Sequence, residues 1–432
     1  MVEILNTSEA VPGENERFEE LGRGCYAYSA DGCSNTGVIV GERGILIVDG
    51  QATPSHADKV LKKIRDITDK PVKQVVLTHF HAENTLGSWT FEPGEVISSD
   101  LTRRMIETRG IEDIHVSRER FRTLFADLSA IPAVCAPTMT IASSMTIDLG
   151  GREVRLMHLG RGHTMGDLVV WVPDSSVIFA GDLVQSTTAP YCGDAHLADW
   201  PRALDRISAF RPNALMPGKG QSVVGIPAVT TAIEMTRDFV TTLRDAAAAC
   251  VEQSLGLKDT FNAVGDALAP QFRSKVDFEF HLPFNVARAY DEALGLDQPQ
   301  VWTRERCADL LDALAGIVAA SAPLEEVSNQ GDEEPQASEE MPQDDAELEV
   351  AEAEDEDQEI SNEISDLVSD SDFAASLGMP IDGDAEEEDE DEALDLSADD
   401  IVENDDDEPE EASSEEGDDT QADDEKVLEE VR

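Results

Sequence analysis

The residues best suited to chemistry are two histidines at alternate positions, His79 and His81, which directly follow an apolar run that ends at Thr78. The run begins with Val75 and predicts a buried strand, so both imidazoles are expected where that strand gives way to a loop. A divalent metal ion is the usual reason for two imidazoles to crowd together at such a place. The spacing therefore predicts a metal-dependent enzyme.

Four short motifs, counting the one around these histidines, follow each other along the chain, and each lies beside a strand-like run. They are Thr78–Asn84 (THFHAEN), Gly162–Gly166 (GHTMG), Phe179–Asp182 (FAGD) and Pro217–Gly220 (PGKG). This order resembles the metallo-β-lactamase fold superfamily, whose usual pattern is T-H-x-H-x-D-H, then G-H-T-x-G, then G-D, then a P-G-H-type loop. The resemblance covers residues 17–225. It implies an α/β (α+β) fold, an αββα sandwich with the metal site at one edge of two packed sheets.

Longer pieces look closest to a group of uncharacterised bacterial metallohydrolases within that superfamily. They include His158–Thr164 (HLGRGHT), Phe179–Val184 (FAGDLV), Asp199–Pro201 (DWP) and Leu282–Glu292 (LPFNVARAYDE). The group implies no particular substrate.

Carried over position by position, the resemblance assigns His79, His81 and His163 to the three imidazole ligands of the first metal ion. It assigns Asp182 to the carboxylate that bridges two ions in the hydrolytic branches. Imidazoles suit zinc or iron, and the carboxylate neutralises charge and orients a bound water. Zinc can lower the pKa of such a water to about 7. Hydrogen-bonded core histidines are the less favoured interpretation for a set of this size.

The second metal position departs from the superfamily pattern at three residues. Glu83 replaces the usual Asp, Asn84 replaces a His, and Lys219 replaces the His of the last loop. Asn is a poor ligand for a transition metal, and an ammonium group repels a second cation. One Zn²⁺ is therefore expected rather than two, with Lys219 in the space of the second ion. Glu83 is then the candidate general base, and Lys219 would bind a substrate carboxylate or stabilise a developing oxyanion; an exposed turn lysine is the alternative.

These residues favour hydrolysis of a small ester, lactone, thioester or amide by a metal-activated water. Two alternatives stay open. His79, His163 and Asp182 also form a two-His-one-carboxylate set that resembles the Fe²⁺ site of persulfide dioxygenases. The missing ligands alternatively suggest a degenerate fold that serves as a binding or scaffold protein.

Other polar residues are expected to support the site. Asp49 closes a strand and would hold the metal loop by hydrogen bonds, while His158 is either a supporting residue or a core histidine. Tyr191, Asp194 and His196 follow the GD motif and would line the pocket.

The spacing of apolar residues along the sequence predicts the strands and helices that position these residues. Strands are expected at residues 25–29, 37–40, 45–48, 73–78, 95–98, 153–159, 168–172, 177–180 and 214–217, and helices at 55–68, 101–108 and 199–210. Residues 111–137 fit no clear pattern. Their arginines Arg118, Arg120 and Arg122 are expected on a solvated loop or helix, with a position facing the substrate as the alternative. From residue 226 to about 320 the pattern becomes helical. One long amphipathic face is marked by Val229, Ile233, Val240, Leu243, Ala247 and Val251, and shorter helices are expected at 259–268, 285–294 and 303–320.

The acidic residues are distributed unevenly along the chain. Of its net charge of −60, residues 324–432 carry 49 Asp and Glu against two Lys and Arg. Such a segment repels itself, so a disordered acidic tail is predicted, with a protein partner as one possible role. The expected organisation is a catalytic domain at 1–225, a helical extension at 226–322 and the tail at 323–432.

Composition also excludes several classes of protein. The sequence has no basic patch, so a nucleic acid is not expected as a partner, and anionic membranes would repel the tail. No secretory signal or run of about 18 apolar residues is present. Six cysteines without C-x-x-C spacing fit a reducing cytoplasm.

Overall fold

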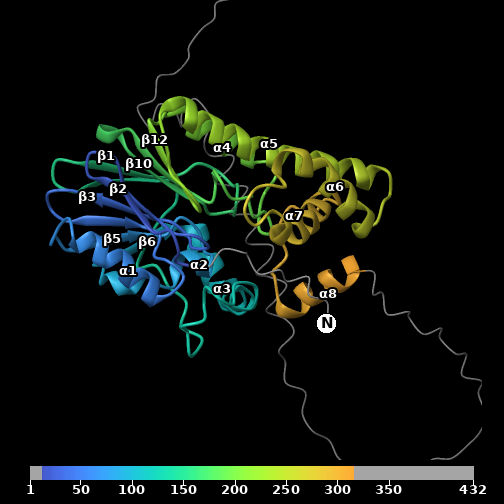
Figure 1. Cartoon of the computed structure of the whole chain (residues 1–432), viewed down its shortest axis with the longest axis horizontal. Coiled ribbons are helices and arrows are strands. Elements are labelled where there is room, and N and C mark those ends of the chain that lie inside the picture. The colour runs from blue at the N-terminus through green and yellow to red at the C-terminus, as the bar shows by residue number, and fades with distance from the viewer. Residues whose placement is uncertain (1–11, 316–432) are drawn as a thin grey trace, which may run out of the picture. The chain divides into compact units, whose positions relative to one another are not determined.

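The computed structural model describes residues 12–315, so the expectations for the acidic tail and its partner lie outside the described residues. Within the described part, two β-sheets lie between helices (Figure 1). The structure confirms the predicted mixed α/β sandwich. No helix among the described residues is long and apolar enough to cross a membrane.

The first sheet has seven strands in sequence order within the described part, antiparallel from β1 to β4 and parallel from β4 to β7. The strands are β1 (Arg17–Gly22), β2 (Cys25–Ser29), β3 (Thr36–Val40), β4 (Ile45–Val48), β5 (Val72–Val76), β6 (Glu95–Ser99) and β7 (Met139–Ile141). Helices α1 (Pro54–Arg65) and α3 (Asp100–Arg120) cover its outer face. The short α2 (Ala82–Thr85) and the 3-10 helix η1 (Ser88–Phe91) follow β5.

The second sheet has six strands within residues 12–315, in the order β13-β12-β11-β10-β9-β8. They are β8 (Ser144–Asp148), β9 (Glu153–His158), β10 (Leu168–Val172), β11 (Val177–Gly181), β12 (Ala214–Pro217) and β13 (Val223–Val224), with the 3-10 helix η2 (Pro173–Ser175) between β10 and β11. Helices α4 (Trp200–Ala209) and α5 (Ile226–Glu252) cover its outer face.

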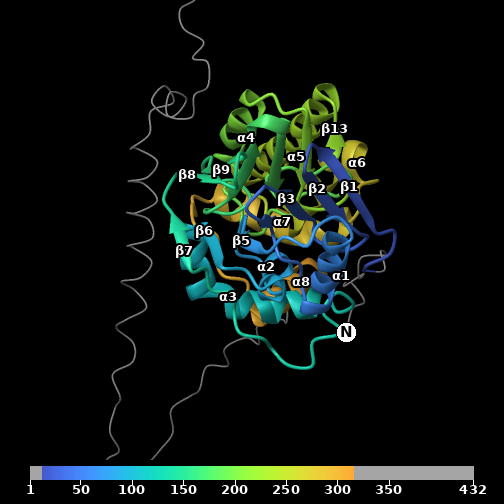
Figure 2. The same ribbon diagram turned by 90° about the vertical axis from the view of Figure 1, so that its left-hand side faces the viewer.

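Three apolar layers explain this arrangement. Strands buried on both faces alternate their side chains between the layer inside the sandwich and the layer beneath the helices. In β11, Phe179 points into the sandwich while Ile178 packs beneath the helices. In β4, Leu46 and Ile47 divide in the same way. Figure 2 shows α1 to α3 on one side of the sheets and α4 and α5 on the other.

The ends of several strands meet at one edge of the sandwich. Strands β11 and β12 are parallel, with Gly181 beside Pro217, and the end of β9 at His158 pairs with Leu168 at the start of β10. The residues that follow β9, β11 and β12 therefore emerge together. These residues include the GHT motif, Asp182 and the last polar loop.

The helical region predicted from residue 226 is present as α5, α6 (Leu257–Phe272), α7 (Phe278–Ala293) and α8 (Arg304–Ala315). The predicted apolar face of α5, with Val229, Ile233, Val240 and Leu243, is buried. The expected helix at 303–320 is described only as far as Ala315. The boundary between a catalytic domain and a helical extension stays a prediction.

Several elements differ from the expectation. Strands β1, β7, β8 and β13 were not predicted; β1, β8 and β13 lie at sheet edges, and their exposed side chains give only weak apolar patterns. Helix α3 was expected to end at residue 108 but continues to Arg120, since Ile114 and Val116 stay buried beyond Gly110. Tertiary packing here outweighs the weak helical pattern.

Candidate metal centre and pocket

Three imidazoles meet at the predicted edge. The structure brings together His79 and His81, which follow β5, and His163, which follows β9; all three are buried. One ligand atom from each lies within 4.8 Å of the others, and His163 Nε2 is 3.1 Å from His81 Nδ1. Nitrogens that share a tetrahedral ion at about 2.1 Å lie about 3.4 Å apart. The cluster thus needs little rearrangement to hold one ion.

Hydrogen bonds on the far side of two rings set their orientation. His81 Nε2 lies 3.1 Å from Asp194 Oδ2, and His163 Nδ1 lies 3.0 Å from the carbonyl oxygen of Tyr191. An imidazole that donates through one nitrogen presents the lone pair of the other to a metal. His81 Nδ1 and His163 Nε2 are therefore the nitrogens available to an ion.

The third ring is held through Asp49. His79 Nδ1 lies 2.9 Å from Thr78 Oγ1, and Thr78 donates from its backbone N–H and hydroxyl to the two oxygens of Asp49, at 2.8 and 2.7 Å. Burial raises the pKa of Asp49 to about 7 although these hydrogen bonds lower it. Asp49 thus supports the metal loop, as expected from the sequence.

Asn84 supports the same loop rather than the metal. Its Nδ2 donates to Asp49 Oδ2 at 3.2 Å, and its Oδ1 accepts from Ser34 Oγ at 3.1 Å. Both polar ends of the side chain are therefore engaged away from the imidazoles.

Asp182 lies beside the histidines. Its Oδ2 is 3.8 Å from His163 Nε2. Burial, and to a smaller extent Glu83, raise the pKa of Asp182 to about 6, although Lys219 and His81 lower it. The predicted carboxylate is therefore within reach of an ion that the imidazoles would hold.

Lys219 and Glu83 form a buried ion pair at the same edge. Lys219 Nζ donates to Glu83 Oε1 at 2.6 Å, and the two residues are 9% and 5% exposed. Burial opposes both charges, but Lys219 and His81 still hold the pKa of Glu83 below its ordinary value. Glu83 and Asp182 likewise hold the pKa of Lys219 above its ordinary value despite burial. Lys219 is thus not an exposed turn residue.

The chemistry of the site fits a cation. Three buried atoms here, His79 Nε2, Asp182 Oδ1 and Glu83 Oε2, have no hydrogen-bond partner among the described residues. Buried polar atoms normally have partners, and all three atoms can donate an electron pair to a metal. The histidines and Asp182 would hold the ion.

No family model matches the chain. It is 25% identical over 240 residues to a linear primary-alkylsulfatase from Pseudomonas sp., which covers 48% of this chain and 45% of that protein. It is 31% identical over 99 residues to the type 2 metallo-β-lactamase of Bacteroides fragilis, a match that covers 22% of this chain and 40% of that protein. It is 23% identical over 206 residues to the type 2 metallo-β-lactamase of Bacillus cereus, a match that covers 45% of this chain and 70% of that protein. These sequence relatives support membership of the metallo-β-lactamase fold superfamily, at 23–31% identity over part of the chain.

Solved structures include a metallo-β-lactamase from Pontibacter korlensis, which is 20% identical and covers 51% of this chain and 99% of its own, with a TM-score of 0.39. The matched region spans less than half of the alkylsulfatase and of the Bacteroides fragilis enzyme.

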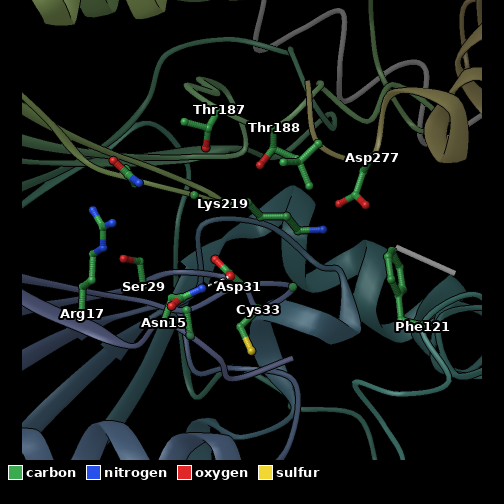
Figure 3. Close-up of a pocket in the computed structure, with 15 residues that line it drawn as sticks. Asn15, Arg17, Ser29, Asp31, Cys33, Phe121, Thr187, Thr188, Lys219 and Asp277 are labelled. Atoms are coloured by element: carbon green, nitrogen blue, oxygen red, sulfur yellow. Dashed lines mark hydrogen bonds between the residues drawn. The ribbon is translucent and has the colours of Figure 1, made fainter. Parts of the chain in front are cut away.

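A pocket of about 270 Å³ opens beside Lys219 (Figure 3). Its lining comes from six parts of the superfamily fold: residues around β1, the β2–β3 connection, the end of α3, the loops after β11 and β12, and the residues before α7. Nine of the fifteen lining residues have polar or charged side chains, and Phe121 and Val276 are among the apolar ones. Since Lys219 also bonds Glu83, it stands between this pocket and the buried metal centre.

Arg120, expected on a solvated surface, is buried. Its Cζ lies 4.1 Å from the ring centre of Phe284 and 4.5 Å from that of Tyr191, and its Nε and Nη2 have no hydrogen-bond partner among the described residues. Aromatic faces attract a guanidinium group. The expectation fails because Tyr191 and Phe284, whose rings lie nearest to Arg120, are far away in the sequence. Arg122 is exposed, as expected.

The remaining histidines lie outside the cluster. His158 Nδ1 bonds the carbonyl oxygen of Asp167 at 2.9 Å, as a buried strand-end residue. His196 is buried with Nδ1 4.0 Å from Asp297 Oδ1, and it is not one of the clustered imidazoles. Tyr191 and Asp194 act through His163 and His81, as described above.

Helix α7 holds the loop that carries Tyr191. Asn285 Oδ1 accepts from the backbone N–H of Cys192 at 2.7 Å, and its Nδ2 donates to the carbonyl oxygen of Pro190 at 2.9 Å. Arg288, which is 1% exposed, donates from Nε to the carbonyl oxygen of Ala195 at 2.6 Å. The sequence offered no signal for these bonds because each joins residues more than ninety positions apart.

Proposed function

We propose that the chain is a metal-dependent hydrolase of a small ester, lactone, thioester or amide, with one Zn²⁺ held by His79, His81, His163 and Asp182. The observation that carries the proposal is the 2.6 Å ion pair between Lys219 and Glu83 beside these ligands. It places a positive charge where the superfamily pattern has a ligand of a second ion. The alkylsulfatase and β-lactamase relatives are hydrolases by name.

The proposed reaction divides the work between the metal and two side chains. A zinc ion at the histidines would supply Lewis acidity and lower the pKa of a water to about 7. Glu83 would take the proton of the attacking water on Oε2, which has no partner, while Lys219 holds Oε1. The ammonium group of Lys219 would donate a hydrogen bond to the oxygen that gains negative charge in the substrate.

Two features support a single ion. A second cation would have to enter beside the buried ammonium of Lys219, which costs Coulomb energy in a site that water screens poorly. Asn84 is turned toward Asp49 and Ser34, so it offers no ligand there.

Metal analysis of the purified full-length protein, together with Glu83→Gln, tests this proposal. We expect one equivalent of zinc per chain in both proteins, and loss of turnover of an ester or lactone panel in the variant only. Two equivalents per chain would contradict the single-ion site. Full activity of Glu83→Gln would contradict the role of Glu83 as base.

The same measurements address the other two interpretations. Iron in place of zinc, with oxygen uptake that depends on a persulfide, would favour the dioxygenase-like enzyme, which uses His79, His163 and Asp182. A purified protein that binds neither metal would favour a scaffold. His79 Nε2, Asp182 Oδ1 and Glu83 Oε2 are buried without hydrogen-bond partners among the described residues, and this supports either metal-binding enzyme over the scaffold protein.

A further inference from the structure

Asp277 has an unusual backbone at the pocket wall. It immediately precedes α7 with φ 62° and ψ 11°, the left-handed region that few residues other than glycine adopt. At this N-cap position an aspartate normally accepts a hydrogen bond from the first turn of the helix, but the Asp277 side chain makes no such bond. Strained residues that give up a common stabilising bond are frequent at binding sites.

Backbone pairing fixes this conformation. Val276 forms a parallel bridge with Thr188: Ala189 donates from its N–H to the carbonyl oxygen of Val276 at 2.8 Å, and the N–H of Val276 donates to Thr187 at 3.2 Å. The residue before Asp277 is therefore held against the loop that follows β11. The carboxylate lies on the pocket wall as a consequence of the fold (Figure 3).

The Asp277 carboxylate has one oxygen without a hydrogen-bond partner among the described residues, although its charge acts on Lys219 and raises the pKa of that ammonium group. This oxygen, Oδ1, is buried. Lys219 is bonded to Glu83, and Asp31 Oδ2 accepts from Asn15 Nδ2 at 2.6 Å. A carboxylate oxygen removed from water without a partner is costly, so a ligand that supplies a donor gains the most at this atom.

We propose that Asp277 selects substrates that carry a protonated amine, which would donate a hydrogen bond to Oδ1 while the scissile group reaches past Lys219. This inference rests on the proposed function, because it takes the pocket beside Lys219 as the substrate entrance. A charged hydrogen bond is about twice as strong as a neutral one, which favours an ammonium group over a hydroxyl group.

Two isosteric thioesters test the inference: S-[2-(dimethylamino)ethyl] thioacetate, whose tertiary amine is protonated at pH 7, and S-(3-methylbutyl) thioacetate, which has a carbon in place of the nitrogen. Binding of each to the full-length zinc-loaded protein is measured by calorimetry in 0.15 M NaCl, which screens attraction of the amine to the acidic chain. We expect wild-type protein to bind the amine about 10- to 100-fold more tightly than the isostere.

The Asp277→Asn variant should abolish this preference and leave the affinity for the neutral isostere unchanged. Asn adopts the left-handed region as readily as Asp, so the fold should persist. Asp31→Asn is the matched control, because it also removes a carboxylate charge from this pocket, but the Asp31 carboxylate already has a hydrogen-bond partner. This variant should still bind the amine more tightly than the neutral isostere. Equal binding of the two probes by wild-type protein, no binding of either, or a preference retained in Asp277→Asn would overturn the inference.

Turnover of the same probes separates this inference from the proposed function. Release of thiol from the neutral isostere reports hydrolysis without involving Asp277. Binding selectivity without any thiol release would uphold the role of Asp277 and count against thioester hydrolysis. Thiol release from both probes with equal affinity would uphold hydrolysis and reject the role of Asp277.

Discussion

Replacement of Lys219 by methionine offers the sharpest test of the buried ion pair. The variant keeps most of the volume of the side chain but leaves Glu83 buried, at 5% exposure, with neither carboxylate oxygen bonded. Breaking a buried pair by removing one partner costs about 3–5 kcal/mol, because the remaining charge is uncompensated. We expect the metal-free variant to lose that much free energy of unfolding.

The double variant Glu83→Gln/Lys219→Met provides the control. Removing both charges leaves no buried ion, so the double variant should recover most of the loss. The free energies are measured by urea unfolding in EDTA, with tryptophan fluorescence as the signal, since Trp171, Trp200 and Trp302 are buried in the folded state. A loss below about 1 kcal/mol in Lys219→Met would refute the reasoning, since that is the range of a solvated pair.

The zinc content of the Lys219→Met variant provides a second measurement. With the ammonium group gone, Glu83 and Asp182 both have free oxygens and no lysine charge beside them. We expect the metal content to rise from one toward two equivalents per chain in Lys219→Met, and to stay at one in the double variant. An unchanged content in Lys219→Met would show that Lys219 does not exclude a second ion.

Three further predictions concern residues around the centre. Asp194→Asn should weaken zinc affinity about 10- to 100-fold because Asp194 orients His81, as measured by competition with a chelator; unchanged affinity would contradict that role. Gly218→Ala should abolish zinc binding, since a Cβ at Gly218 would lie 1.8 Å from Asp182 Oδ1; a normal metal content would contradict it. Burial raises the folded-state pKa of Asp167 from 3.8 to about 7, so its stabilising effect is present at low pH and is lost as pH rises through 7. Between pH 5 and pH 8 the wild type should therefore lose about 2 kcal/mol of unfolding free energy relative to Asp167→Asn in EDTA, and parallel pH profiles would refute this.

The sequence was sufficient for the sandwich and for the histidine cluster because both depend on local patterns. Strands β4 and β10 and most of β11 are continuous apolar runs, and β5 and β9, which precede His79, His81 and His163, carry apolar residues near their ends. Parallel and antiparallel pairing brings the ends of those runs to one edge, so the cluster follows from topology. The assignments of His163 and Asp182 came from the superfamily resemblance of the motifs that follow β9 and β11.

The rest of the site depends on contacts between distant residues. Burial of Lys219 arises from Glu83, 136 positions away, and burial of Arg120 from Tyr191 and Phe284. The spacing of apolar residues in the sequence does not predict such pairs. Asp277 was also missed, because an aspartate before a helix is an ordinary cap and only its dihedral angles show that it does not serve as one.

The bonds from α7 to the Tyr191 loop make the helical region an indirect participant in metal binding. Asn285 fixes the loop whose Tyr191 carbonyl orients His163, so helix docking and ion binding are linked equilibria. By reciprocity, an ion at the histidines should strengthen the docking of α7 as much as α7 strengthens ion binding. Slower amide hydrogen exchange in α7 on zinc addition would then report metal occupancy from a helix that contributes no ligand.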